Sequence, residues 1–333
     1  MTARQPIALT MGDPAGVGPE ITLLAWQTYL SGDAPRFVVI GDPDIYRSIG
    51  FEIAEVGSLR DADSTGTALP VHPIKLPQRP TKGEPNGANA SAVIQSIEIA
   101  VRAVLMGDAA ALVTNPISKA TLYDAGFRHQ GHTDFLGALT ADTSYEGPRG
   151  PVMMLMAADL KVALVTEHLS LRAAAETITR GAIVHTARVV ARSLQQDFGI
   201  ASPRLSVAAL NPHAGERGAL GDEEARIIAP AIAELGALGL SVRGPLPADT
   251  LFHAEARRQS DAVICMYHDQ GLIPVKMLDF WGGVNVTLGL PIVRTSPDHG
   301  TGFDIAGKGV ARPDSLITAL KAADAIARRR ART

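Results

Sequence analysis

The chain has very little cysteine, because Cys265 is the only one among its 333 residues. A single thiol cannot form an internal disulfide, so a small disulfide-stabilised secreted scaffold is excluded. Cys265 also lies within a short apolar run that predicts a buried strand, and a buried thiol is a poor nucleophile. We therefore expect Cys265 to fill space in a core.

An excess of charge of either sign is also missing. Lysine and arginine number 31 against 34 acidic residues, which gives a net charge of -3. The one basic cluster, residues 328–330 with Arg332, stands near the C-terminus, and we interpret it as a solvated helix end. The sequence therefore lacks the electrostatic footprint of a nucleic-acid-binding protein.

Long hydrophobic runs are absent too. The longest apolar run covers residues 152–158 and stops at Asp159, far short of the roughly 20 residues that cross a bilayer. The N-terminus has no basic segment followed by an apolar stretch, which a secretory signal needs. We expect a cytoplasmic protein without a membrane partner.

Neither of two common nucleotide-binding motifs is complete. The spacing of Gly12, Gly16 and Gly18 after an apolar strand does not fit G-x-G-x-x-G. Two interpretations of this loop remain: a tight connection to a helix, or a loop that presents backbone N–H groups to an anion. The segment 302–308 fits half of a phosphate-binding loop, but Gly309 replaces the required Ser or Thr. A Rossmann fingerprint and a P-loop are therefore both excluded.

What the sequence does contain is a regular alternation of strand and helix patterns. Hydrophobic residues make up 46% of the chain and charged residues 20%, which suits a globular protein, and the length suggests two domains. Alternating strands and helices predict an α/β fold with mainly parallel sheets. The expected strands are 7–11, 37–40, 110–113, 152–156, 162–166, 205–210 and 261–267, and the expected helices are 90–106, 173–198 with a break near 181, 222 onward and 316–328.

Three histidines stand close behind the ends of predicted parallel strands, namely His168, His213 and His268. Taken singly, each is more simply a loop histidine. Because neighbouring parallel strands bring their carboxyl ends together, the three imidazoles could meet at one metal ion. Three neutral imidazoles suit zinc and leave one coordination position open for a substrate. His185 lies inside a helix pattern with apolar neighbours, and we interpret it as a structural histidine and not as a metal ligand.

Other polar residues suit an anionic ligand. Lys276, Asn285 and Arg294 supply two cations and an amide that could hold a phosphate or carboxylate, although surface charge explains them equally well on spacing alone. On its own, the triplet from His132 through Thr133 to Asp134 predicts a helix cap, formed by Thr133 or Asp134.

Four segments carry a resemblance to a known family. The tail from Pro297 to Gly309 resembles the His-Gly-x-x-x-Asp-Ile-Ala-Gly-Lys-Gly loop of a dehydrogenase superfamily. The block from Tyr267 to Gly271 (Tyr-His-Asp-Gln-Gly) and the segments 289–291 and 294–296 resemble, within it, the 4-hydroxythreonine-4-phosphate dehydrogenase family of vitamin B6 synthesis. That family lies within the isocitrate/isopropylmalate dehydrogenase superfamily, and the resemblance covers nearly the whole chain. It implies two α/β domains around a cleft, the first made of residues 1–128 plus 300–333 and the second, 129–299, carrying metal and dimer-interface residues.

The resemblance also implies roles for individual residues. The metal ligands would be His168, His213 and His268. The substrate-binding residues would be His132, Thr133, Lys276, Asn285 and Arg294. The cofactor-binding residues would be Asp298, His299, Gly300, Thr301 and Asp304. The candidates for proton transfer or for orienting a ligand would be Asp249, Asp269 and Lys276.

The activity that the resemblance implies is oxidation of 4-phosphohydroxy-L-threonine by NAD, or NADP, with a divalent metal. Zinc is expected, with cobalt or magnesium as alternatives, and a homodimer with the active site at its interface. The segment 167–170 and Ala219 depart from the family's common pattern. Relatives that oxidise D-threonate or D-erythronate 4-phosphate share nearly every motif, so a sugar-acid dehydrogenase is the first alternative. A non-catalytic phosphometabolite-binding protein is the second.

Overall fold

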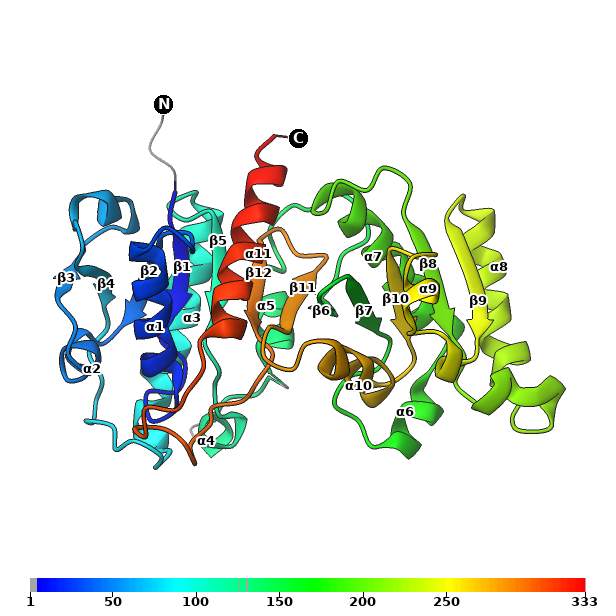
Figure 1. Cartoon of the computed structure of the whole chain (residues 1–333), viewed down its shortest axis with the longest axis horizontal. Coiled ribbons are helices and arrows are strands. Elements are labelled where there is room, and N and C mark those ends of the chain that lie inside the picture. Colours follow the sequence, from blue (N-terminus) through cyan, green and yellow to red (C-terminus); the bar gives the residue numbers. More distant parts are fainter. Residues whose placement is uncertain (1–4, 125, 130, 333) are drawn as a thin grey trace. The chain divides into compact units, whose positions relative to one another are not determined.

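The structure is a computed structural model that describes residues 5–124, 126–129 and 131–332 (Figure 1). The chain divides into two compact units. Unit 1 consists of Met1–Thr143 with Pro291–Arg328, and unit 2 consists of Ser144–Leu290 with Arg329–Thr333. Each unit has a sheet covered by helices, so the expected α/β class with mainly parallel sheets is confirmed.

The sheet of unit 1 has six strands in the order β3-β4-β2-β1-β5-β12, and every pairing between neighbours is parallel. The central strands are buried on both faces, which explains their continuous apolar runs. The strands are β1 (Ile7–Thr10), β2 (Phe37–Gly41), β3 (Ile53–Glu55), β4 (Leu69–Pro73), β5 (Ala111–Thr114) and β12 (Arg294–Pro297).

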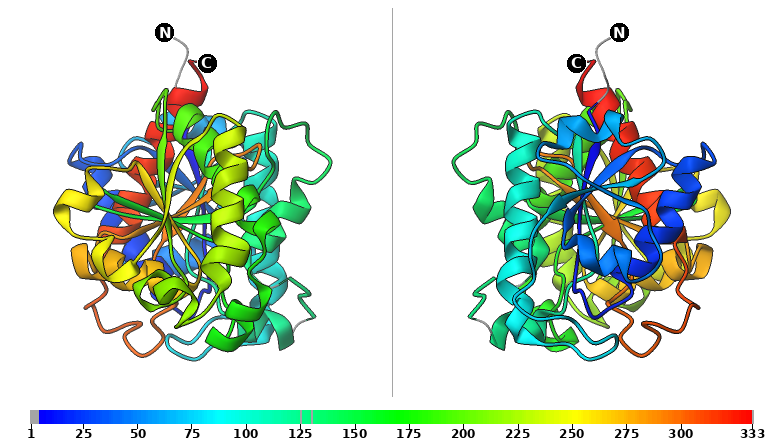
Figure 2. Two further views of the ribbon diagram at one scale, coloured as in Figure 1. Left: turned by 90° about the vertical axis from the view of Figure 1, so that its right-hand side faces the viewer. Right: turned by 90° about the vertical axis from the view of Figure 1, so that its left-hand side faces the viewer.

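Helices cover both faces of this sheet. α3 packs on β1, β2 and β5 from one side, while α1 and α11 lie on the other side (Figures 1 and 2). The helical elements are α1 (Gly18–Leu30), α2 (Pro43–Arg47), η1 (Leu59–Ser64), η2 (Gly87–Asn89), α3 (Ala90–Leu105), α4 (Lys119–Asp124), α5 (His132–Leu139) and α11 (Asp314–Arg330).

One helical segment, Gly87–Leu105, is long and apolar enough to cross a membrane by length and composition. Half of it is buried inside the protein, against the sheet of unit 1. Its apolar residues therefore already have a partner within the fold, as in the core helix of a globular protein.

The unit boundaries lie at 143/144 and 290/291, whereas the sequence suggested 128/129 and 299/300. Two elements account for the difference. The helix α5 packs against α3, so residues up to Thr143 belong with unit 1. β12 pairs in parallel with β5, with Arg294 opposite Leu112, so unit 1 resumes before that strand.

Unit 2 has a mixed sheet in the order β11-β6-β7-β10-β8-β9. β6 pairs antiparallel with both β11 and β7, while β7, β10, β8 and β9 run parallel to one another. The strands are β6 (Val152–Ala157), β7 (Leu160–Leu164), β8 (Arg204–Ala208), β9 (Ser241–Leu246), β10 (Ala262–Cys265) and β11 (Val284–Leu288).

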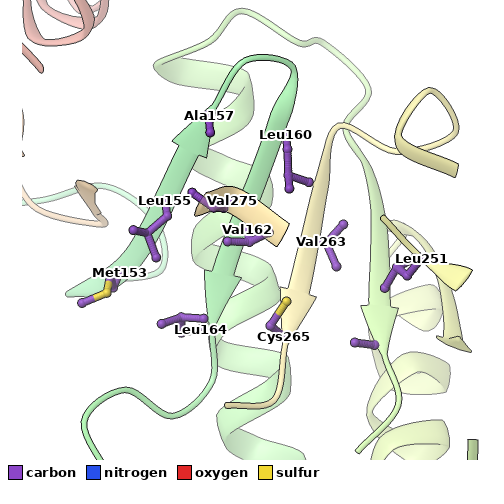
Figure 3. Packing of buried hydrophobic residues seen from close by; sticks show 11 residues of the cluster. Met153, Leu155, Ala157, Leu160, Val162, Leu164, Leu251, Val263, Cys265 and Val275 are labelled. Atoms are coloured by element: carbon purple, nitrogen blue, oxygen red, sulfur yellow. The ribbon is translucent and has the colours of Figure 1, made fainter. Parts of the chain in front are cut away.

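The core of unit 2 lies between the sheet and α10. Alternate residues of β6, β7 and β10 meet Val275 of α10 on one face, as Figure 3 shows. Cys265 is fully buried within this cluster, which fits the space-filling role expected of it, and burial raises the pKa of its thiol. The helical elements of unit 2 are α6 (Leu171–Thr177), α7 (Arg180–Gln196), η3 (Pro212–Gly218), η4 (Glu224–Ile228), α8 (Ala229–Ala237), η5 (Ala248–Thr250), α9 (Ala254–Arg257) and α10 (His268–Leu278).

The segment after β10 is a helix although its residues favour a loop. α10 begins at His268 and contains both Gly271 and Pro274, residues that favour loops in a sequence pattern. A Cβ on Gly271 would lie 2.9 Å from Leu164 Cδ2, so glycine lets α10 approach β7 closely without displacing that side chain. Pro274 lies inside α10, where it has no N–H to donate to the preceding turn.

The C-terminal arginines are only partly a solvated helix end. Arg330 donates two hydrogen bonds to the buried Asp197 carboxylate, at 2.7 and 3.1 Å, and a third to Leu290 O. A guanidinium that forms a bidentate pair with a buried carboxylate is a structural element. His185 also differs from expectation, because it is exposed on α7.

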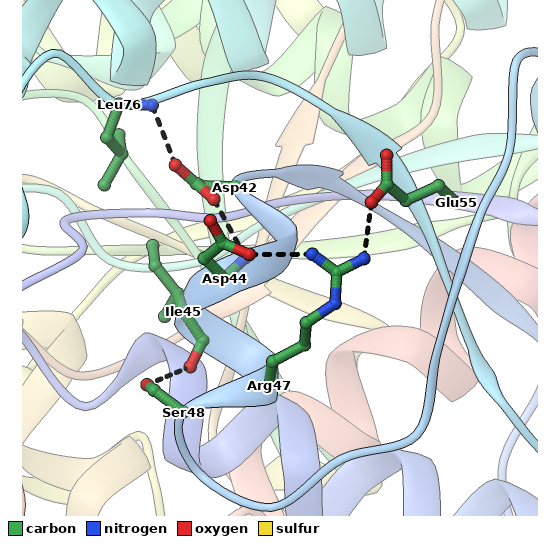
Figure 4. A network of polar contacts seen from close by, with 7 residues as sticks. All are labelled: Asp42, Asp44, Ile45, Arg47, Ser48, Glu55 and Leu76. Atoms are coloured by element: carbon green, nitrogen blue, oxygen red, sulfur yellow. Dashed lines mark hydrogen bonds and ion pairs between the residues drawn. The ribbon is translucent and has the colours of Figure 1, made fainter.

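Hydrogen bonds and ion pairs stabilise the edge of the unit 1 sheet (Figure 4). Asp42 caps α2 by accepting a hydrogen bond from Asp44 N and also accepts one from Leu76 N. Arg47 pairs with Asp44 and with Glu55 of the edge strand β3. All three ionic groups are largely exposed, so each pair stabilises the edge by about 0–1 kcal/mol.

Candidate active site

The three histidines of unit 2 follow three strands that lie side by side. β10 stands between β7 and β8 and runs parallel to both. His168, His213 and His268 follow β7, β8 and β10 by four, five and three residues. The expectation that these strands are parallel neighbours is confirmed, and their carboxyl ends are the edge at which ligands bind in α/β sheets.

Two of these imidazoles face one another. The ring centroids of His168 and His268 lie 5.6 Å apart. Two imidazoles on one tetrahedral zinc, with Zn–N distances of about 2.1 Å, have ring centroids roughly 5 Å apart. The pair therefore fits a shared divalent metal. Across residues 5–124, 126–129 and 131–332, no three His, Cys, Asp or Glu side chains gather closely enough to hold one, so His213 does not complete the set in this conformation.

Carboxylates lie beside both facing imidazoles. Asp269 Oδ1 accepts a hydrogen bond from His268 Nδ1 at 2.7 Å, and Glu167 Oε2 lies 3.9 Å from His168 Nδ1. A carboxylate that accepts a hydrogen bond from Nδ1 keeps the proton on that nitrogen. The Nε2 lone pair is then available to bind a metal ion. Asp269 was a candidate for proton transfer or for orienting a histidine, and its contact with His268 supports the second role.

His213 lies on a turn of left-handed backbone, which costs about 1–2 kcal/mol for each non-glycine residue. The buried Glu224 carboxylate anchors the segment that leads into this turn by accepting hydrogen bonds from Leu210 N at 2.8 Å and Asn211 N at 2.7 Å. Burial opposes ionisation, but the hydrogen bonds from Asn211 and the backbone keep the pKa of Glu224 below its usual value. The non-glycine residues of this turn with positive φ are His213, Ala214, Glu216 and Arg217.

Asp249 belongs to the same neighbourhood. It is exposed on η5, and η5 packs against η3, the turn that carries His213. No sequence pattern predicts that these two turns meet, because 36 residues separate His213 from Asp249. Their proximity supports a role for Asp249 beside that histidine.

Lys276 and Asn285 are on regular elements of unit 2. Lys276 lies on α10 eight residues after His268, about 12 Å along the helix axis, and its Nζ is 5.3 Å from the centre of the Phe280 ring. Asn285 lies in β11, and its side-chain oxygen is buried with no hydrogen-bond partner among the described residues. A buried amide oxygen of this kind is suited to accept a hydrogen bond from a ligand.

A second polar group lies in unit 1, around His132. His132 and Thr133 are the first residues of α5, whose N-cap is Gly131, so the expected cap by Thr133 or Asp134 was wrong. Burial, and then the cations of Arg294 and Lys119, lower the pKa of His132 well below its usual range. His132 is therefore neutral at pH 7, and its Nε2 is buried without a hydrogen-bond partner in the part of the chain that the structure describes.

This arrangement suits an anion. Arg294 is buried in β12 and donates from Nη2 to Thr114 Oγ1 at 2.6 Å. A buried guanidinium, a nearby ammonium and the N-terminus of α5 together favour a phosphate or carboxylate. Sequence reasoning missed Lys119, although its place just after β5, at the start of α4, was a usable signal.

The segment expected to bind the cofactor packs on the first glycine loop. Val17 N donates to Thr301 O at 2.8 Å, and a Cβ on Gly16 would lie 2.6 Å from that oxygen, so only glycine allows this approach. Asp298 N donates to Ser315 Oγ of α11. The remaining expected residues, His299, Gly300 and Asp304, lie on the same segment, which ends before α11.

The fold and these strand-end groups are typical of an α/β enzyme that acts on a small anionic substrate. A family model described as pyridoxal phosphate biosynthetic protein PdxA matches residues 33–323. The chain belongs to this family.

Similar proteins match it from end to end. The 4-hydroxythreonine-4-phosphate dehydrogenase of Caulobacter vibrioides is 56% identical over 99% of each chain. The crystal structure of 4-hydroxythreonine-4-phosphate dehydrogenase from Klebsiella pneumoniae is 40% identical, with a TM-score of 0.85 over 97% of this chain and 99% of that one. The X-ray structure of the enzyme of that name from Burkholderia phymatum is 37% identical, with a TM-score of 0.78 over 97% and 99%.

Proposed function

We propose that this chain is a dehydrogenase that oxidises 4-phosphohydroxy-L-threonine at its 3-hydroxyl to 2-amino-3-oxo-4-phosphooxybutanoate in pyridoxal phosphate synthesis. The observation that carries the proposal is the 56% identity, over the full length of both chains, to a relative named 4-hydroxythreonine-4-phosphate dehydrogenase. The product is a β-keto acid, so it loses CO2 readily and gives 3-amino-2-oxopropyl phosphate.

His168, His213 and His268 would hold a divalent metal, with zinc first and cobalt or magnesium as alternatives. When bound, such an ion would act as a Lewis acid toward the substrate oxygen. The facing rings of His168 and His268 support this assignment. Asp269 would keep the proton on His268 Nδ1, and the candidates to accept the hydroxyl proton are Asp249, Asp269 and Lys276.

The anionic ends of the substrate would be bound by cations and neutral polar groups. Arg294, with Lys119 beside the neutral His132, supports a site for phosphate or carboxylate in unit 1. Thr133, on the first turn of α5, would add a hydroxyl there. In unit 2, Lys276 and the unpartnered Asn285 oxygen would bind further substrate oxygens or hydroxyls.

The nicotinamide cofactor, which would accept the hydride, is NAD in this proposal, with NADP as the alternative. The segment from Asp298 to Asp304 would bind it, with His299, Gly300 and Thr301 between them. The contact between Thr301 and the first glycine loop supports this role, because it fixes the segment against the end of β1. The soluble substrate and cofactor, with a single buried cysteine, fit a cytoplasmic location.

We also propose a homodimer formed through α10. The outer side of this helix and the residues after it expose large apolar side chains, and Met277 is 81% exposed. Soluble monomers rarely expose such a cluster, so it supports an interface. Because α10 begins at His268, the partner subunit would lie next to the metal site. The exposed apolar residues are Ile273, Met277, Leu278, Phe280 and Trp281.

The interface can be tested by charge. Met277→Glu should convert a dimer into a monomer in light scattering, because a buried unpaired carboxylate is costly. Val310→Glu is the matched control, since Val310 is exposed in unit 1 and should leave the dimer intact. A monomeric wild-type protein, or a dimeric Met277→Glu variant, would contradict the proposed interface.

The activity is tested with purified protein, a divalent metal, NAD and 4-phosphohydroxy-L-threonine, by following NADH absorbance. NADH formation coupled to CO2 release is expected. Binding of the substrate without any NADH formation, with zinc, cobalt and magnesium each supplied, would instead favour a non-catalytic phosphometabolite-binding protein.

A further inference from the structure

Two buried side chains join the carboxyl ends of β7, β10 and β8. Thr166 Oγ1 donates a hydrogen bond to Met266 O at 2.8 Å. Gln270 accepts one from Met266 N at 2.7 Å through Oε1, and it donates one to Ala209 O at 2.7 Å through Nε2. Both backbone groups of Met266 are therefore bonded by side chains, one from the segment after β7 and one from α10.

These bonds stand at the ends of the strands. β10 stops at Cys265 and β8 at Ala208, so Met266 and Ala209 each lie one residue beyond a strand. Met266, Ala209, Gln270 and Thr166 are all buried, and buried backbone groups must be paired. Gln270 meets this need because its amide has both an acceptor and a donor, which neither glutamate nor methionine offers together.

The bonded positions lie close to the three histidines along the chain. Thr166 is two residues before His168, and Met266 is two residues before His268. Ala209 is four residues before His213. With so few residues between, any sliding of one strand end relative to its neighbour is passed on to the imidazole that follows it.

We infer that Gln270 and Thr166 are positioning residues that fix the spacing of the three imidazoles, without touching substrate or metal themselves. The inference rests on the proposed function, in which those histidines bind a metal ion. Metal–nitrogen bonds of about 2.0–2.1 Å tolerate little displacement, and removing a group that orients metal ligands weakens metal binding by about 10-fold to 100-fold.

Four substitutions separate positioning from general stability. Thr166→Val keeps the side-chain shape but removes the hydroxyl, whereas Thr166→Ser keeps the hydroxyl. Gln270→Met keeps the length and removes both polar atoms. Val263→Ala is the matched control, because it opens a small cavity in β10 and destabilises the same sheet while the bonds to Met266 remain.

The measurement is a Co²⁺ titration of the full-length, metal-stripped protein, followed by the visible absorption of bound cobalt, with urea unfolding on the same samples. We expect Thr166→Val and Gln270→Met to raise the Kd for cobalt by about 10-fold or more. Thr166→Ser should restore wild-type affinity, and Val263→Ala should bind cobalt normally despite its lower stability.

Failure of the metal assignment and failure of the positioning role would give different results. If the wild-type protein binds no cobalt, the metal assignment itself fails and the positioning role fails with it. If the wild type binds cobalt and Gln270→Met binds it equally well, or if Val263→Ala weakens binding as much, then the metal site stands and the positioning role is wrong.

Discussion

The imidazole rings of His168 and His268 lie with their centroids 5.6 Å apart, although 100 residues separate them in the sequence. The cause is the strand order, because β7 and β10 are parallel neighbours and end at the same edge. Two strands thus deliver two potential ligands at a spacing that a single metal ion can bridge. The third, His213, follows β8 on the other side of β10.

We predict that His213→Asn removes most of the bound metal and abolishes turnover. Asparagine tolerates the left-handed backbone of residue 213, so the turn should survive while the imidazole is lost. His185→Asn is the matched control, since His185 is exposed on α7 and does not directly follow a strand. Elemental analysis of both purified variants checks this, and full metal content in His213→Asn would exclude it as a ligand.

Removing a cation should affect the substrate and spare the cofactor. Arg294→Met or Lys276→Met should raise KM for the phosphorylated substrate by about 10-fold to 1,000-fold, the equivalent of about 1.4–4 kcal/mol of charge-assisted binding. KM for NAD should change little. Steady-state kinetics with each substrate varied in turn is the measurement, and a selective loss of NAD affinity would move these residues to the cofactor pocket.

His132 should make stability depend on pH. Its folded-state pKa is depressed below the unfolded value of 6.5, so the unfolded chain binds the extra proton. The free energy of unfolding is therefore undiminished above pH 6.5 and falls as pH drops below it, by at most about 1.4 kcal/mol per pH unit from this group. Urea unfolding at pH 7 and pH 5.5 should show a smaller loss for His132→Gln than for the wild type. Equal losses would mean that His132 is protonated in the folded protein.

Arg330 should contribute far more stability than its neighbour Arg328. Arg330 pairs with Asp197, which is only 3% exposed, whereas Arg328 pairs with Asp324 from a side chain that is 55% exposed. Arg330→Met leaves a buried carboxylate unpaired and should cost about 3–5 kcal/mol, while Arg328→Met should cost about 0–1 kcal/mol. Urea unfolding of the two variants is the comparison, and similar costs would show that the Asp197 pair adds no special stability.

Much of the strand framework could be predicted from the sequence. Runs such as 262–265 are apolar throughout because parallel strands are buried on both faces, and such runs are easily recognised. Polar residues that directly follow those runs then mark the edge of the sheet, and His168 and His268 are predicted as site residues for this reason. The same reasoning could have included Lys119, which follows β5.

Other features depend on contacts that a linear pattern does not contain. Gly271 and Pro274 favour a loop locally, yet they lie within α10 because the helix packs closely on β7. Arg330 looked like solvated charge because its partner, Asp197, is 133 residues away. The left-handed turn at His213 follows a segment whose backbone the Glu224 carboxylate binds, and no periodicity reveals either feature.

The last prediction concerns the group at C2 of the substrate. An amino group and a hydroxyl are similar in size, so shape alone cannot separate 4-phosphohydroxy-L-threonine from D-threonate or D-erythronate 4-phosphate. An ammonium, however, needs an acceptor or an acid, and the unpartnered Asn285 oxygen and the carboxylate of Asp269 are groups of that kind in unit 2. We predict that kcat/KM with NAD is at least about tenfold higher for 4-phosphohydroxy-L-threonine, since one well-placed polar contact supplies about 1.4 kcal/mol in the transition state. Parallel assays of the three substrates measure it. A tenfold preference for either sugar acid would keep the dehydrogenase chemistry but place the enzyme in sugar-acid catabolism. Residues 167–170, which depart from the family's common pattern, would then be the first positions to replace with the family's residues.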